Sequence, residues 1–154
     1  MSKIWVDADA CPKAIRDVIL RAAERTSINT FLVANHALPV NRTANVSMLS
    51  VPSGADAADQ LIIDRSDAGH LVITADLPLA DAVLKKGTQV LTPRGESLTL
   101  DNIRARLNMR DFMDTMRASG EHSRGQKTLN ERDVRTFANA FDRLVTRMHA
   151  TQTR

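Results

Sequence analysis

Short apolar runs alternate with amphipathic stretches through the first 95 residues of the chain. The runs are rich in β-branched side chains, which favours strands, and they cover residues 4–6, 29–34, 46–51, 71–74 and 88–91. The stretches between them predict helices at residues 12–25, 55–64 and 78–86. Strands that alternate with helices predict an α/β fold with a mainly parallel, five-stranded sheet.

Glycine and proline mark the ends of these elements. Gly69 and Gly87 are predicted to end two of the helices, and residues 93–95 to turn the chain out of the sheet. The pattern is purely helical after that turn, with helices predicted at residues 100–116 and 130–149 and a mobile loop at 119–127. We therefore expect a single domain over residues 1–150, with an α/β core at 1–95, a helical appendage at 96–150 and a tail at 151–154.

Aspartates follow two of the predicted strands. Asp7 directly follows the first strand and Asp76 the fourth, and the helix that starts near Gly54 begins at the same edge of the sheet. We expect the first and fourth strands to be neighbours, which brings these acids together at the carboxyl ends of the strands. The aspartates that can converge there are Asp7, Asp9, Asp56, Asp59, Asp76 and Asp81.

Several carboxylates in one crevice repel one another, and a hard cation relieves that repulsion. We therefore expect the six aspartates to bind Mg²⁺ or Mn²⁺, an ion that activates water and neutralises a phosphodiester under attack. No histidine lies at a spacing that favours zinc. Asp9 also has a simpler interpretation, because it could cap the helix that begins at Pro12.

The amino-acid composition limits the classes of partner that the protein can bind. Aromatic residues make up 3% of the chain, which argues against a base-stacking sheet surface. The single cysteine excludes an internal disulfide. The sequence shows no signal-peptide pattern and no apolar run of membrane-spanning length, so we expect a cytoplasmic protein that does not bind membranes. Residues 1–93 carry a net charge of −1 and residues 94–154 one of +4, so the second part is suited to following a polyanion.

Polar and basic residues near the predicted site are candidates for substrate binding. Asn35 and Thr74 end strands on that edge, and Arg94 follows the fifth strand as a candidate phosphate ligand. Arg106 and Arg110 belong to a helical stripe of basic residues. Such residues predict weak, salt-dependent binding of single-stranded RNA or DNA.

Five short motifs can be compared with known families. They read Val-Asp-Ala-Asp-Ala-Cys-Pro at 6–12, Val-Ala-Asn at 33–35, Gly-Ala-Asp-Ala-Ala-Asp at 54–59, Val-Ile-Thr-Ala-Asp-Leu-Pro-Leu-Ala at 72–80 and Leu-Thr-Pro-Arg-Gly at 91–95. Together they resemble the YaiI/YqxD-like family of bacterial proteins, which is related to PIN and NYN nuclease-like domains by fold and by acids at strand ends. The resemblance implies a PIN-like three-layer fold. It also implies metal-binding carboxylates at Asp7, Asp56 or Asp59, Asp76 and Asp81.

The sequence departs from that family at two places. Residues 69–70 are Gly-His where members often have Gly-Asp, at the end of the strand away from the predicted site. Residues 125–127 are Gly-Gln-Lys where members often have Gly-Gly-Pro, which argues against an anion-binding role for that loop.

Three functions remain open at this point. The leading hypothesis is a metal-dependent phosphodiesterase, a ribonuclease-like PIN-type domain with Asp7, Asp56, Asp59 and Asp76 as catalytic residues. A haloacid-dehalogenase-like phosphatase also has Asp-x-Asp after its first strand, but it needs paired acids after the fourth strand, where Asp76 stands alone. The third hypothesis is a non-catalytic module that binds nucleic acid or has a regulatory role.

Overall fold

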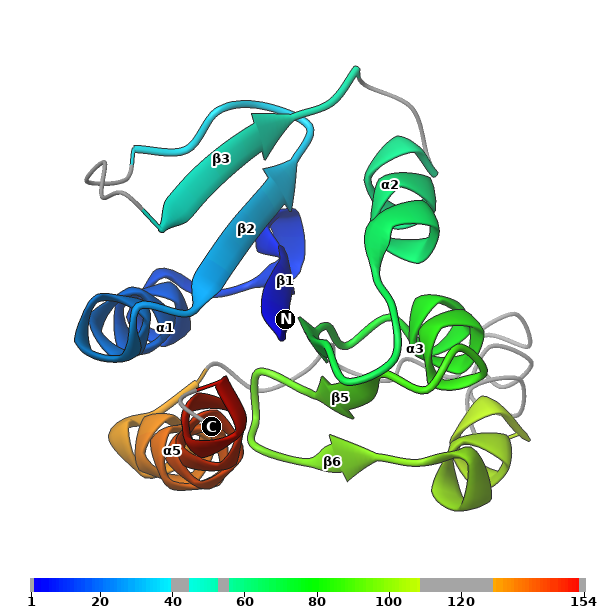
Figure 1. Ribbon diagram of the computed structural model, residues 1–154. Coiled ribbons are helices and arrows are strands. Elements are labelled where there is room, and N and C mark those ends of the chain that lie inside the picture. The colour runs from blue at the N-terminus through cyan, green and yellow to red at the C-terminus, as the bar shows by residue number, and fades with distance from the viewer. Residues whose placement is uncertain (1, 40–44, 53–55, 109–128, 153–154) are drawn as a thin grey trace.

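A computed structural model of the chain describes residues 2–39, 45–52, 56–108 and 129–152 (Figure 1). The strands in this part of the chain form one sheet in the order β3-β2-β1-β4-β5-β6. They are β1 (Lys3–Asp7), β2 (Asn29–Ala34), β3 (Val46–Ser50), β4 (Leu71–Ile73), β5 (Gln89–Leu91) and β6 (Ser97–Leu98). The α/β fold class with a mainly parallel sheet is confirmed, with six strands in place of the predicted five.

Strands β1 to β5 are parallel to their neighbours, and β6 runs antiparallel to β5. The first and fourth strands are adjacent, as predicted, with Val6 opposite Ile73. Asp7 and Thr74 therefore leave the sheet side by side at the carboxyl ends of β1 and β4.

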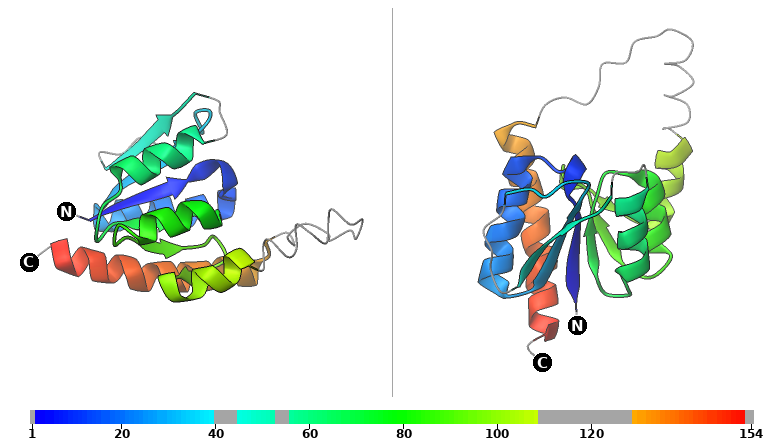
Figure 2. Two further views of the ribbon diagram at one scale, coloured as in Figure 1. Left: turned by 90° about the vertical axis from the view of Figure 1, so that its right-hand side faces the viewer. Right: turned by 90° about the horizontal axis from the view of Figure 1, so that it is seen from above.

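Helices cover both faces of the sheet, so the domain has three layers (Figure 2). Helices α1 and α5 lie on one face, and α2, α3 and a helix at residues 100–108 lie on the other. The bounds are η1 (Ala8–Ala10), α1 (Lys13–Thr26), α2 (Ala57–Arg65), α3 (Leu77–Leu84) and α5 (Glu131–Gln152).

The alternation of side chains along β1 explains why both faces are covered. Ile4 and Val6 point into the core beneath α1 and α5, whereas Trp5 packs on the opposite face, where it stacks on Phe31 with ring centroids 4.5 Å apart. All three central residues of β1 are buried, as expected for a strand inside a parallel sheet.

Two local predictions were wrong. Helix α2 ends at Arg65, because Ser66 is already extended, and Gly69 instead occupies the turn before β4 with φ +84°. The turn at residues 93–95 does not leave the sheet, because it joins β5 to β6 in an antiparallel hairpin. A strand of two residues is too short to produce an alternation in the sequence, which is why β6 was not predicted.

The final helix completes the core. Phe137, Phe141 and Val145 of α5 are buried in the same cluster as Ile4 and Val6 of β1. The predicted loop at residues 119–127, and residues 109–116 of the predicted helix before it, lie outside the described part of the chain. Among the helices that are described, none has the length and apolar character needed to cross a bilayer.

Candidate functional site

The strand order places a crevice between β1 and β4. From β1 the chain proceeds to β2 and β3 on one side, and β4 is followed by β5 on the other, so the direction of winding reverses between β1 and β4. In open parallel sheets, ligands bind at the carboxyl ends of the strands at such a reversal. Asp7 ends β1 and Asp76 immediately precedes α3, so both carboxylates lie at this position.

Asp7 is buried, with 8% of its surface exposed. The Thr74 hydroxyl donates a hydrogen bond of 2.9 Å to Asp7 Oδ2, and the same hydroxyl oxygen accepts one of 3.0 Å from the backbone N–H of Asp76. Burial raises the pKa of the Asp7 carboxyl, the Thr74 bond opposes that rise, and the nearby charges of Asp76 and Asp9 add to it. Thr74, predicted as a substrate ligand, therefore supports the Asp7 carboxylate and links it to Asp76.

Asp76 caps helix α3. Its Oδ1 accepts a hydrogen bond of 2.9 Å from the backbone N–H of Leu79, and Pro78 occupies the first turn of the helix. The cap fixes the orientation of the carboxylate. One oxygen of Asp76 and one of Asp7 make no hydrogen bond to any residue that the structure describes, so each is available to a ligand.

Asp59 joins these two acids from the first turn of α2. Its side chain is half-buried, and burial together with the charges of Asp76, Asp7 and Asp56 raises its pKa to about 6. Asp56 is exposed at the start of the same helix and acts on Asp59 through its charge. The charge of Asp76 acts on both Asp7 and Asp59, so three elements distant in sequence bring these acids near one another. We call Asp7, Asp59 and Asp76 the carboxylate cluster.

The carboxylate cluster offers the hard oxygen ligands that Mg²⁺ and Mn²⁺ prefer. Within the described ranges, however, no three side chains of His, Cys, Asp or Glu already converge at metal-binding distance. The residue types fit a divalent cation, and side-chain rotations within the cluster would be needed to coordinate it.

The other two predicted metal ligands have different partners. Asp9 Oδ2 accepts a hydrogen bond of 2.7 Å from the backbone N–H of Asn35, and it does not cap α1, which begins after Pro12 without a side-chain cap. Asn35 Oδ1 is buried and accepts no hydrogen bond from the described residues. Asp81 lies further along α3, where it forms an ion pair of 3.0 Å with Lys85.

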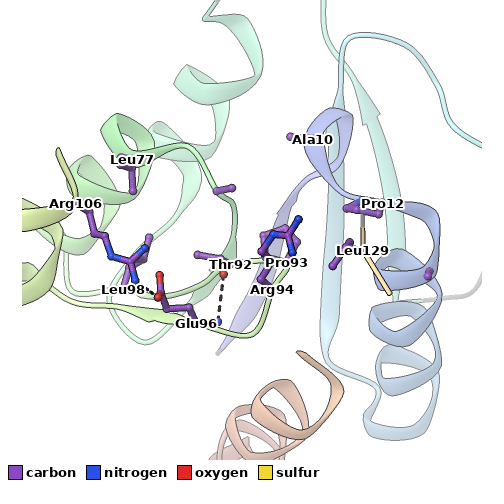
Figure 3. A pocket seen from close by; sticks show the side chains of 12 residues that line it. Ala10, Pro12, Leu77, Thr92, Pro93, Arg94, Glu96, Leu98, Arg106 and Leu129 are labelled. Carbon is purple, nitrogen blue, oxygen red and sulfur yellow. Dashed lines mark hydrogen bonds and ion pairs between the residues drawn. The ribbon is translucent and has the colours of Figure 1, made fainter. Parts of the chain in front are cut away.

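Arg94 and Arg106 line a cavity of about 740 Å³ (Figure 3), whose lining also includes Ala75 and Leu77 on either side of Asp76. Arg94 pairs with Asp133 at 3.3 Å, and Arg106 pairs with Glu96. Arg110 lies outside the described residues. Thr92 and Glu96 also line this cavity, and neither was predicted as a site residue because the β5–β6 hairpin that presents them was not predicted.

Cys11 is close to the cluster but buried. Burial raises the pKa of its thiol to about 12, which leaves almost no thiolate at neutral pH. The residue packs in the core beneath α1 as a small apolar side chain.

Comparison with known proteins places the chain in a family. The model of a family described as "Uncharacterized BCR, YaiI/YqxD family" matches residues 5–147. The chain belongs to the YaiI/YqxD family. The predicted resemblance is thereby confirmed, and the match to the YaiI/YqxD model includes all six aspartates of the predicted site.

Curated relatives of this YaiI/YqxD chain carry the name UPF0178 protein. One from Vibrio atlanticus is 56% identical over 143 residues, which cover 93% of this chain and 97% of the relative. One from Colwellia psychrerythraea is 51% identical over 150 residues, which cover 97% of this chain and 99% of the relative. No solved structure matches the chain significantly.

Proposed function

We propose that the carboxylate cluster binds a divalent cation and that the protein hydrolyses phosphodiester bonds in single-stranded nucleic acid. The observation that carries the proposal is the meeting of Asp7, Asp59 and Asp76 at the reversal between β1 and β4. Like charges held this closely are unfavourable on their own, and a cation with hard oxygen ligands compensates them.

The residues of the cluster have separable roles in this proposal. Asp7 is fixed by Thr74 and Asp76 by the N-terminus of α3, so these two provide a rigid pair of oxygens. Asp59 is less buried and completes the set by a side-chain rotation. A bound Mg²⁺ or Mn²⁺ supplies Lewis acidity and a more acidic water.

Basic residues beside the cluster support a polyanionic substrate. Arg94 and Arg106 line the cavity that Ala75 and Leu77 also line, on either side of Asp76, and each is held by a carboxylate partner. A guanidinium held in this way can contact a phosphate with little loss of side-chain entropy. A phosphate that replaces one of these carboxylate partners gains a guanidinium contact, which offsets part of its repulsion from the carboxylate cluster.

Cation binding is tested by thermal unfolding with and without millimolar Mg²⁺ or Mn²⁺. A cation that binds the folded state raises the melting temperature by mass action, and we expect Asp7→Asn and Asp59→Asn to reduce that rise. Asp101→Asn is the matched control, since Asp101 is exposed and lies outside the cluster. Equal shifts in all four proteins, or no shift in the wild type, would contradict the proposed cation site.

Hydrolysis is tested on single-stranded RNA, single-stranded DNA and a phosphomonoester with either cation present. We expect cleavage of a single strand that is lost in Asp76→Asn. Turnover of the phosphomonoester alone would instead support a phosphatase. Salt-sensitive binding of the strands without cleavage would support a non-catalytic nucleic-acid module.

A further inference from the structure

None of the three residues of the carboxylate cluster lines the cavity of about 740 Å³. Its lining includes Ala10, Ala75 and Leu77, which are sequence neighbours of Asp9 and Asp76. A group bound in the cavity is therefore in contact with the residues on both sides of Asp76. The volume is within the range of about 300–1,000 Å³ that is common for sites that bind small molecules.

The cavity has two apolar sides that face each other. Figure 3 places Ala10, Pro12 and Leu129 on one side and Leu77 and Leu98 on the other. Opposed apolar surfaces suit a flat ring that has hydrophobic faces. Between the two sides lie Thr92, Pro93, Arg94 and Glu96, and Arg106 reaches Glu96 from the side of Leu77 and Leu98.

The polar groups are held in place by one another. Thr92 and Glu96 exchange hydrogen bonds across the β5–β6 turn, with the Thr92 N–H donating to the Glu96 carbonyl at 2.8 Å and the Glu96 N–H to Thr92 Oγ1 at 3.2 Å. Glu96 also pairs with Arg106 from the helix at residues 100–108, as Figure 3 shows. The cavity therefore presents guanidinium donors and carboxylate acceptors side by side.

Nucleobases combine apolar faces with an edge that carries adjacent donors and acceptors. We propose that this cavity receives the base of one nucleotide, whose phosphate then faces Asp7 and Asp76; the orientation of the phosphate rests on the proposed function. A base in a duplex is stacked and paired, so the occupant is an unpaired base of a single strand. A free nucleotide has the same base and phosphate, and the experiment distinguishes a free nucleotide from a single strand as the occupant.

The test fills the cavity without changing the acids or the arginines. Ala14 lines the cavity and is exposed on α1, so Ala14→Trp places a large side chain there without disturbing the core. Ala105→Trp is the matched control, because Ala105 is exposed and does not line the cavity. The probes are a fluorescent single-stranded oligonucleotide and an abasic strand of equal length, measured by anisotropy at constant salt without divalent cations.

We expect the wild type to bind the base-containing strand more tightly than the abasic strand. Ala14→Trp should weaken binding of the base-containing strand about tenfold and leave the abasic strand unchanged, while Ala105→Trp should match the wild type. Competition by a nucleoside monophosphate as effective as that of the strand would support the cavity and identify a free nucleotide as its occupant. Equal wild-type affinity for both strands, or an equal loss for both strands in Ala14→Trp, would overturn the inference.

Cleavage measured in parallel separates this inference from the proposed function. If the wild type and Ala14→Trp cleave a strand equally well, the cavity does not hold a base and the proposed hydrolysis stands. If no cleavage and no cation-dependent stabilisation occur, but base-dependent binding is lost in Ala14→Trp, the proposed hydrolysis fails and the cavity remains a nucleotide site.

Discussion

Asp59 shows how the fold changes the chemistry of a single side chain. It is half-buried on the first turn of α2, and its pKa rises to about 6 because of burial and the charges of Asp76, Asp7 and Asp56. The aspartate pattern in the sequence predicted that these acids would meet, since parallel strands end at one edge. It did not predict that the pKa of Asp59 would rise, because that rise depends on the burial of the side chain in the folded protein and on the charges around it.

Replacing Asp59 by Asn should stabilise the protein above pH 6, the value to which the pKa of Asp59 is raised. The folded state holds the Asp59 proton more tightly than the unfolded state, so the wild type loses stability as pH rises from 3.8 to about 6. We expect a gain on the order of 1 kcal/mol for Asp59→Asn at neutral pH, because solvent screens a half-exposed charge. Urea unfolding at several pH values measures the difference.

The matched control for this substitution is Asp101→Asn, on an exposed residue away from the cluster. Its stability relative to the wild type should not change across the same pH range. A gain for Asp59→Asn that persists well below pH 3.8, where the carboxyl is protonated in both states, would show that ionisation of the buried carboxyl is not its cause.

At the scale of elements, regular periodicity was predictable and short irregular structure was not. The buried parallel strands were found from their β-branched runs, and α1 from the spacing of its apolar residues. Strand β6 has two residues and depends on pairing with β5, so no local pattern reveals it. The cavity was missed for the same reason, because its walls come from residues 10–14, 75–77, 92–98, 106 and 129, which only the tertiary fold assembles.

The β5–β6 hairpin turns at Gly95, which packs directly on α5. Gly95 has φ +87°, and a Cβ there would lie 2.9 Å from backbone atoms of Thr136 and Phe137. We expect Gly95→Ala to lower the free energy of unfolding by about 3 kcal/mol, through backbone strain and displacement of α5. Urea unfolding measures the loss.

Gly69→Ala is the control for the effect of backbone conformation alone. Gly69 has φ +84°, and a Cβ there would meet no atom within 4 Å. Gly69→Ala should therefore lower the free energy of unfolding by only about 1 kcal/mol. Equal losses at the two glycines would show that the close approach of the hairpin to α5 contributes nothing.

At the scale of the whole molecule, α5 is an integral part of the domain core. Phe137 and Phe141 stack on each other with centroids 5.2 Å apart, and both are buried among residues of β1 and α1. On the opposite face of the sheet, Trp5 stacks on Phe31 and donates a hydrogen bond of 3.2 Å to His70 Nδ1. The two faces share β1, so they should unfold together.

We expect Phe141→Ala to lower the free energy of unfolding by about 4 kcal/mol, because apolar surface is no longer buried and a cavity is left behind. Trp5 is the single tryptophan and the chain has no tyrosine, so intrinsic fluorescence reports on the opposite face. In the variant, denaturation followed by fluorescence and by far-UV circular dichroism should shift to the same lower midpoint. Asn139→Ala, at an exposed position on α5, should leave the fluorescence midpoint and the circular dichroism midpoint unchanged.

A fluorescence midpoint equal to that of the wild type, with only the circular dichroism midpoint lowered, would mean that α5 unfolds by itself. In that case the helix would be a separately stable appendage to the sheet.

The adjacency of β1 and β4 also sets an order of events during synthesis. β1 can pair with β2 and β2 with β3 from residues 3–50, whereas the contact of Asp7 with Thr74 spans 67 positions. A nascent chain that has not yet reached β4 leaves one edge of β1 unpaired, and a hydrophobic edge of that kind invites association with other chains. Pairing with β4 covers this edge and brings Asp76 to Asp7 in a single step. Translation products that end before β4 would therefore be prone to aggregation and would lack the carboxylate cluster.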